Sequence, residues 1–100
     1  MREMELSVPA RSDVKSLWRT IASDNLVAAN RILDRIDATF QHLRESPHVG
    51  SDMSQYGIGL RAFSVGNYVV SFINDDRRVT IVRVIHGARD FPDVFRGRNS

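Results

Sequence analysis

Polar and apolar residues alternate over residues 3–8, and this two-residue period predicts a short strand with one apolar face. Pro9 follows, and proline suits the first turn of a helix because its missing N–H has no hydrogen bond to lose there. Apolar residues then recur at intervals of three and four, which predicts an amphipathic helix over residues 10–22. Its apolar stripe consists of Val14, Leu17, Trp18 and Ile21.

A second, longer amphipathic pattern begins after Asp24-Asn25, either of which can cap a helix, and it ends before Pro47. The pattern extends over about five turns at 3.6 residues each. Its apolar positions are Ala29, Ile32, Leu33, Ile36, Phe40 and Leu43. Because only a few residues separate the two helices, we expect an antiparallel helical hairpin.

Residues 48–59 contain three glycines and few apolar residues, so we expect a loop there. Three strand-like runs follow at residues 60–65, 68–73 and 79–85, and the first two are joined by Gly66-Asn67, which tolerates a tight hairpin turn. The short connections predict antiparallel pairing between these strands. The third run is apolar on both faces, so we expect it inside the sheet.

The predicted order is strand, helix, helix and three strands, followed by a short helical turn within residues 88–95. This order predicts an α+β fold in two layers, in which a helix hairpin packs on a small antiparallel sheet. The helices cover only one face of that sheet. We therefore expect a partner on the other face or along the groove of the hairpin.

The chain has 100 residues, and we expect a single domain spanning residues 1–100. The apolar share of 42% excludes disorder of the whole chain, and no apolar run approaches the roughly 18 residues of a membrane span. The lack of cysteine, together with acids where a signal peptide is apolar, favours the cytoplasm. The net charge of +2 favours a solvated surface of mixed charge over a dense basic patch for nucleic acid.

The three histidines lie far apart, and none has a ligand spacing such as H-E-x-x-H, so we expect neither a metal nor a cofactor. No glycine-rich phosphate loop follows a strand, and no G-x-S-x-G motif occurs. A nucleophilic triad stays open at this point, because its members meet only in space.

The most informative polar residues lie within or just after the predicted strands: Arg61, Arg83, His86 and Arg89. A guanidinium in an apolar run needs a carboxylate partner or an exit to solvent. We favour ion pairs that hold the sheet edge, with an acid such as Asp13 or Asp90. The alternative is a cationic surface that grips phosphate or an acidic partner segment, with a histidine as a proton-transfer group.

The aromatic residues admit two interpretations. Trp18 lies on the apolar stripe of the first helix, so core packing is the default and a partner-binding anchor is the alternative. Phe63, Tyr68 and Phe72 alternate with smaller residues, a pattern that favours cross-strand packing over stacking on nucleic-acid bases.

Four stretches, in this order along the chain, match a family pattern: residues 17–25 (LWRTIASDN) with Ala28-Ala29, 46–50 (SPHVG), 59–68 (GLRAFSVGNY) and 81–90 (IVRVIHGARD). Together they resemble the ParE toxins of bacterial type II toxin–antitoxin modules, within the RelE/ParE superfamily. The resemblance covers about residues 6–95. The chain departs from the family at residues 51–55 and 70–73, which leaves the exact partner contacts and the target open.

The resemblance implies a cytoplasmic toxin of a plasmid-stabilisation type, neutralised by a ParD-like antitoxin that is encoded beside it. Such an antitoxin has a DNA-binding dimerisation domain and a C-terminal segment that wraps the toxin, so the toxin meets DNA only through it. The implied target is DNA gyrase, which ParE toxins poison by binding and without catalysing a reaction themselves. The resemblance implies neither a cofactor nor a membrane partner. The residues we expect to bind antitoxin or target are Trp18, Arg61, Phe63, Phe72, Arg83, His86 and Arg89.

Two alternatives remain at this stage. The first is a RelE-like, ribosome-dependent mRNA endonuclease, for which Arg61, Arg83 and His86 are the candidate catalytic residues. This enzyme class uses lysines, arginines and often a C-terminal tyrosine, whereas the chain has one lysine and no tyrosine beyond Tyr68. The second is a relative that only binds an antitoxin. We favour the gyrase toxin, and we expect Arg83→Ala to weaken toxicity or antitoxin binding more than folding.

Overall fold

The computed structural model describes residues 2–46 and 48–87. Its helices are α1 (Val8–Ala22) and α2 (Leu26–Glu45), and a short 3-10 turn, η1, spans Ser54–Tyr56. Its strands are β1 (Glu3–Leu6), β2 (Ser51–Asp52), β3 (Leu60–Val65), β4 (Tyr68–Asn74) and β5 (Arg78–His86). The predicted helical turn within residues 88–95 lies outside the described residues.

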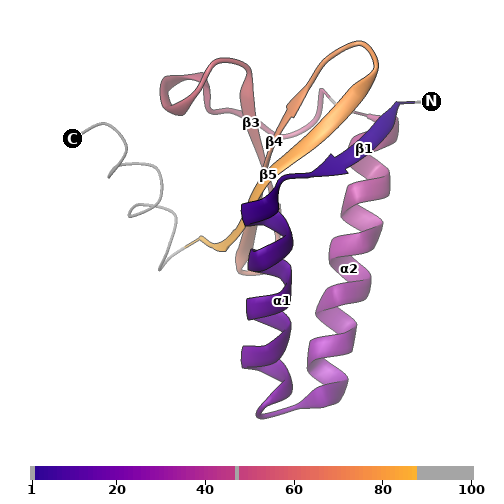
Figure 1. Cartoon of the computed structure of the whole chain (residues 1–100), viewed down its shortest axis with the longest axis vertical. Coiled ribbons are helices and arrows are strands. Elements are labelled where there is room, and N and C mark those ends of the chain that lie inside the picture. Colours follow the sequence, from indigo (N-terminus) through magenta and orange to yellow (C-terminus); the bar gives the residue numbers. More distant parts are fainter. Residues whose placement is uncertain (1, 47, 88–100) are drawn as a thin grey trace.

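The five strands form one sheet in the order β1-β5-β4-β3-β2, and the two helices pack on it as a second layer (Figure 1). This confirms the α+β fold and the helix hairpin. The sheet is mixed rather than antiparallel, because β1 runs parallel to β5. Short connections force antiparallel pairing only between consecutive strands, and the whole hairpin and three strands separate β1 from β5. The predicted loop over residues 48–59 also contains β2 and η1.

Both helices begin at side-chain caps. Ser7 accepts a hydrogen bond from the backbone N–H of Ala10, so α1 starts at Val8, inside the segment that we predicted as strand. Asn25 accepts from the N–H of Ala28 and starts α2, which identifies the capping residue of the Asp24-Asn25 pair. The helices lie side by side, and the end where they are joined extends beyond the sheet (Figure 1).

The main core lies between the helices and the sheet. Phe72, Ile36 and Ile81 are fully buried there, each contributing about 1.5–3 kcal/mol to folding. On the opposite face of the sheet, Leu60 and Ile85 are buried, and Met53 and Tyr56 from the η1 segment pack against them. The chain's own residues therefore cover part of the sheet face on which we expected a partner.

No helix among residues 2–46 and 48–87 combines the length and the apolar character needed to cross a lipid bilayer.

Candidate functional site

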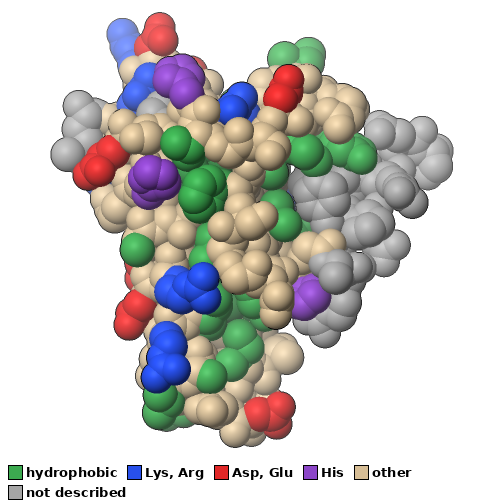
Figure 2. Space-filling model, turned by 180° about the vertical axis from the view of Figure 1, so that it is seen from behind, with side chains coloured by type: hydrophobic (Ala, Val, Ile, Leu, Met, Phe, Trp, Pro, Cys, Tyr) green, Lys and Arg blue, Asp and Glu red, His purple; other side chains and the backbone are tan. Residues whose placement is uncertain are grey.

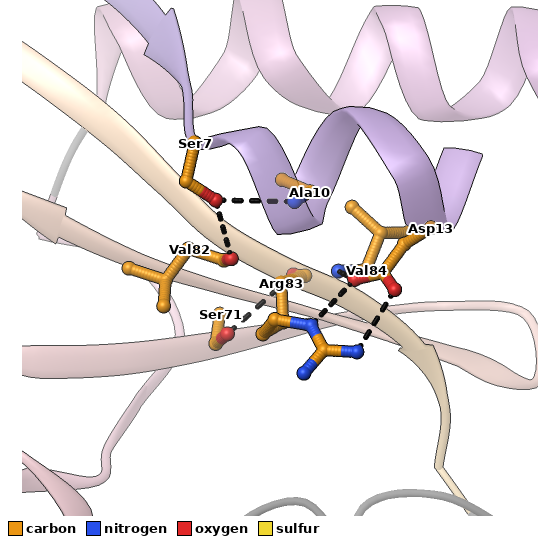
Figure 3. Close-up of polar contacts among 7 residues, drawn as sticks. All are labelled: Ser7, Ala10, Asp13, Ser71, Val82, Arg83 and Val84. Carbon is orange, nitrogen blue, oxygen red and sulfur yellow. Dashed lines mark hydrogen bonds and ion pairs between the residues drawn. The ribbon is translucent and has the colours of Figure 1, made fainter. Parts of the chain in front are cut away.

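The start of α1 completes the outer edge of β5 where β1 ends (Figure 3). The backbone N–H of Ser7 donates to the carbonyl of Ile81 at 2.9 Å, and the Ser7 hydroxyl donates to the carbonyl of Val82 at 2.7 Å. One turn into α1, Asp13 Oδ2 accepts the backbone N–H of Val84 at 3.0 Å. The capping residue Ser7 and the Asp13 side chain of α1 thus make the hydrogen bonds that a neighbouring strand would otherwise make.

Asp13 also holds Arg83. The Arg83 Nε lies 2.7 Å from Asp13 Oδ2, and Nη2 donates to Oδ1 at 2.9 Å, so the pair is bidentate (Figure 3). The two side chains are only 28% and 14% exposed. For Arg83 and Asp13 this confirms the ion pair at the sheet edge. Asp90, the other carboxylate considered, and Arg89 lie outside the described residues.

A β-bulge precedes Arg83. Phe72 pairs with Ile81 and Ser71 pairs with Arg83, which leaves Val82 without a partner opposite it. Ile81 and Val84, three residues apart, consequently both contact the main core. A bulge re-aims the side chains beyond it, and here it accompanies the turn of Arg83 toward α1. The run over residues 79–85, which is apolar on both faces, gave no sign of this bulge.

Arg61 binds backbone carbonyls instead of a carboxylate. Its Nε donates to Val49 at 3.2 Å, and its Nη2 donates to His48 and Gly50 at 2.9 Å each. The predicted ion pair is therefore wrong for Arg61, because three convergent carbonyls of residues 48–50 occupy the guanidinium. Gly50 has a φ of +88°, and a Cβ there would lie 2.4 Å from the carbonyl oxygen of Ala62.

Asp52 lies opposite Arg61 in the β2–β3 pair. The pKa of Asp52 is lowered, first because the backbone N–H of Ser54 donates to its carboxylate at 2.8 Å, next through the Ser54 hydroxyl, and further by the charge of Arg61. This keeps a negative charge at the exposed edge strand, where it discourages strand pairing with another chain.

The candidate catalytic residues do not form one site. Arg61 reaches the segment before β2, whereas Arg83 reaches α1 beside β5, and these are opposite edges of the sheet. His86 pairs in register with Tyr68, and their rings meet edge to face at 5.6 Å. Arg61 pairs with Phe72, four residues farther along the same strand. The cationic sheet surface that we weighed as an alternative is thus not assembled by these three residues.

Two aromatic residues differ in their access to a partner. Phe63 is partly buried, and its ring contacts the ring of His42 on α2 at 5.6 Å. Phe72 is fully buried in the main core, so its predicted contact with antitoxin or target is wrong. The alternating pattern indicated which face of the strand Phe72 occupies but not how deeply the side chain is buried. It is fully buried because β4 is the middle strand of the sheet.

Charges are mixed on the surface. On the face shown in Figure 2, Lys and Arg side chains are scattered among neutral, apolar and acidic ones and do not form one continuous basic surface. Within the described residues, no group of three or more His, Cys, Asp or Glu is arranged to hold a metal ion.

The remaining candidate, Trp18, lies at a shallow hollow between the outer sides of the two helices. Val14, Trp18 and Leu33 form its apolar walls, Lys15 and Arg19 form its rim, and its volume is about 310 Å³. The Trp18 indole N–H donates to Asn30 Oδ1 of α2 at 3.0 Å, which fixes the ring across the hairpin. Sequence analysis missed Asn30, because nothing in its spacing marks it as a partner of Trp18.

Three comparisons bear on these features. The family model described as "ParE toxin of type II toxin-antitoxin system, parDE" matches residues 4–91. Toxin ParE3 of Caulobacter vibrioides is 32% identical over 80 residues, which are 79% of this chain and 80% of that protein.

Two solved structures are similar in fold. The chromosomal ParDE toxin–antitoxin system from P. aeruginosa superposes with a TM-score of 0.72 at 13% identity, covering 86% of this chain and 96% of that one. The RelBE2 toxin–antitoxin complex from Mycobacterium tuberculosis gives a TM-score of 0.61 at 25% identity, covering 85% and 90%.

Proposed function

Because this chain belongs to the ParE toxin family of type II toxin–antitoxin systems, we propose that it poisons DNA gyrase by binding and that a ParD-like antitoxin neutralises it. Gyrase acts on DNA in the bacterial cytoplasm, so the toxin would act there, and DNA would reach it only through its target or its antitoxin. A module of this kind stabilises the plasmid or chromosomal segment that encodes it.

One observation carries the proposal for binding without chemistry. Cleavage of RNA through its 2′-hydroxyl needs a base, an acid and cations gathered around one phosphate. In this chain Arg61 and Arg83 point to opposite edges of the sheet, and each already binds backbone carbonyls or a carboxylate. Using them on a phosphate would cost the contacts that hold residues 48–50 and α1 in place.

The RelE-like endonuclease remains the second candidate, because the RelBE2 complex shares the fold at 25% identity. A supercoiling assay with trapping of cleaved DNA, run beside coupled transcription and translation, separates the two functions. We expect inhibited supercoiling, trapped cleaved DNA and intact mRNA. The same toxin preincubated with the antitoxin encoded by the neighbouring gene is the control and should be inactive.

If mRNA is cut and gyrase is unaffected, the gyrase proposal is wrong and the chain is an mRNA endonuclease. If neither gyrase nor mRNA is affected while the antitoxin still binds, the gyrase function is wrong and only the antitoxin partner stands.

A further inference from the structure

The outer half of α1 repeats a pair of polar side chains every four residues. In each pair a cationic residue is followed directly by a hydroxyl residue, and all six side chains are exposed. Successive residues of a helix are about 100° apart, so the cations form one row along α1 and the hydroxyls form a second row beside it. The buried residues of α1 lie on its opposite side, so both rows face solvent. The pairs are Arg11-Ser12, Lys15-Ser16 and Arg19-Thr20.

The cation row has no acidic partner within the part of the chain that the structure describes. The acid of α1, Asp13, is bound to Arg83, and no other carboxylate of residues 2–46 and 48–87 lies within 4.0 Å of the three cations. Like charges four residues apart on a helix repel one another. In the same part of the chain the hydroxyl row makes no hydrogen bond. A ligand that accepts from both rows would therefore relieve the repulsion without breaking a contact of the fold.

The spacing of the rows suits a polyanion with evenly spaced charge. Arg11 and Arg19 are separated by about 12 Å along the helix axis, and one strand of duplex DNA presents roughly three or four phosphates over that length. Each phosphate carries several acceptor oxygens, so a cation and the hydroxyl next to it can both donate to it. Arg, Lys, Ser and Thr are among the side chains that contact DNA phosphates in complexes.

Two other anionic surfaces fit less well. A helix that lies on a lipid bilayer combines cations with exposed apolar side chains. Within α1, Val8 is the one large apolar side chain that is exposed. An acidic protein segment would have to place its carboxylates at one regular spacing, whereas the backbone of a nucleic acid supplies that spacing in any sequence.

We propose that the outer half of α1 binds the phosphodiester backbone of duplex DNA, with the cation row and the hydroxyl row donating to successive phosphates of one strand. The inference rests on the proposed function, because a toxin bound to gyrase lies beside the DNA that gyrase holds. Contacts to phosphates carry no base information, so the binding is independent of sequence. The net charge of only +2 does not reveal this surface, because most of the acids that offset the cations lie on other elements.

Binding of the toxin alone to a fluorescent DNA duplex of about 20 base pairs tests the cation row. Three phosphate contacts make the logarithm of the binding constant fall with the logarithm of the salt concentration with a slope of about −2.7. In R11Q/K15Q/R19Q, glutamine keeps the helix propensity of exposed positions, so the fold should be unchanged. We expect the affinity at low salt to fall about tenfold or more and the slope to approach zero.

The matched control R31Q/R35Q/R77Q removes the same charge from exposed positions on α2 and in the turn between β4 and β5. It should bind the duplex like the wild type. This control separates a contact made by α1 from a general effect of net charge.

A second variant tests the hydroxyl row at constant charge. In S12A/S16A/T20A, alanine favours the helix, and the three cations remain. Affinity for the duplex should fall about threefold or more with an unchanged salt slope, because hydrogen bonds are lost while the ionic contacts persist. S51A/S64A removes exposed hydroxyls from β2 and β3 and should bind like the wild type.

Trapping of cleaved DNA by gyrase tests the same surface in the proposed function. R11Q/K15Q/R19Q should need about tenfold more toxin than the wild type or R31Q/R35Q/R77Q for half-maximal trapping. DNA binding that depends on the two rows while trapping is unchanged would overturn their place in the gyrase complex.

The remaining outcomes separate the inference from the proposed function. Equal DNA affinity in R11Q/K15Q/R19Q and its control overturns the inference and leaves the gyrase function intact. Tighter binding to an RNA duplex of the same length overturns the choice of DNA. Unchanged DNA binding with weaker binding to phosphatidylglycerol vesicles, or to the antitoxin, assigns the cations to a membrane or to an acidic protein instead. If the wild-type toxin neither inhibits supercoiling nor traps cleaved DNA, the proposed function fails, while the measurements on the toxin alone still decide the DNA contact.

Discussion

The Asp13 carboxylate accepts a hydrogen bond from the backbone N–H of Val84 and also forms a bidentate ion pair with the Arg83 guanidinium. One side chain thus satisfies a backbone donor of β5 and a charged side chain. The carboxylate is only 14% exposed. Removing it leaves the backbone N–H of Val84 without its acceptor and takes the bidentate carboxylate from the partly buried Arg83 guanidinium, whereas removing the arginine leaves the Val84 hydrogen bond in place. The two residues should therefore contribute unequally to stability.

We predict that Asp13→Ala lowers the free energy of unfolding by about 2–4 kcal/mol and Arg83→Ala by about 1–2 kcal/mol. Urea unfolding of both single variants and the double variant measures the difference and the coupling between the side chains. From the sequence we expected Arg83→Ala to weaken toxicity or antitoxin binding more than folding, and the bidentate pair with Asp13 adds an expected loss of stability to that expectation. Equal losses in the two single variants would contradict the role assigned to the Val84 hydrogen bond.

A second prediction concerns Gly50. An alanine there meets the carbonyl oxygen of Ala62 at 2.4 Å and must adopt a φ of +88°. We expect Gly50→Ala to cost about 2–4 kcal/mol, since a strained backbone and a steric clash add together.

Gly57→Ala is the matched control for Gly50→Ala. Gly57 has an extended φ of 173°, and an added Cβ would meet Leu60 only at an ordinary 3.8 Å. Thermal unfolding should show a clearly lower Tm for Gly50→Ala and a change of about a degree or two for Gly57→Ala. A similar Tm in both variants would mean that residues 48–50 readjust freely.

The third prediction concerns pH. The backbone N–H groups of Arg77 and Arg78 donate to Asp75 at 2.8 Å each and lower the pKa of this carboxyl in the folded chain. In the unfolded chain the carboxyl takes up its proton near its ordinary value of about 4. Between these two pKa values the unfolded state binds more protons than the folded state. The stabilisation that the Asp75 carboxylate contributes is therefore fully present above about pH 4 and is lost as the pH falls through the lower pKa of the folded chain.

Asp75→Asn keeps an oxygen that accepts both turn hydrogen bonds but does not titrate. Urea unfolding from pH 6 down to about pH 2 should therefore give a flatter decline for Asp75→Asn than for the wild type. Asp76→Asn is the control, because the neighbouring carboxylate does not receive the two turn bonds. If the two variants flatten the profile equally, general charge and not the turn of Asp75 sets the pH dependence.

The hydrophobic pattern was sufficient to predict the helices and β3, β4 and β5, since the period of a segment is a property of the sequence. The sequence also indicated that a guanidinium within an apolar strand needs a partner, but it offered both Asp13 and Asp90, and only the structure shows that Asp13 binds Arg83. The parallel direction of β1 could not be predicted from this pattern, because its partner β5 lies at the far end of the described chain. The partners of Arg61 were also hidden. They are backbone carbonyls, which every residue has, so the sequence does not indicate where three of them converge on one guanidinium.

The final prediction uses Arg61 to distinguish support of a loop from catalysis. Its guanidinium holds three carbonyls with two nitrogens, and a lysine ammonium cannot reproduce that fork. Arg61→Lys should cost about 1–2 kcal/mol in stability and speed amide hydrogen exchange at residues 49–52, while the folded variant still arrests bacterial growth. Arg44→Lys is a control of the same type, because the Arg44 side chain donates to a single carbonyl, that of Arg2. This variant should lose less stability than Arg61→Lys. Full stability of Arg61→Lys with complete loss of toxicity would instead assign this arginine to the target or to catalysis.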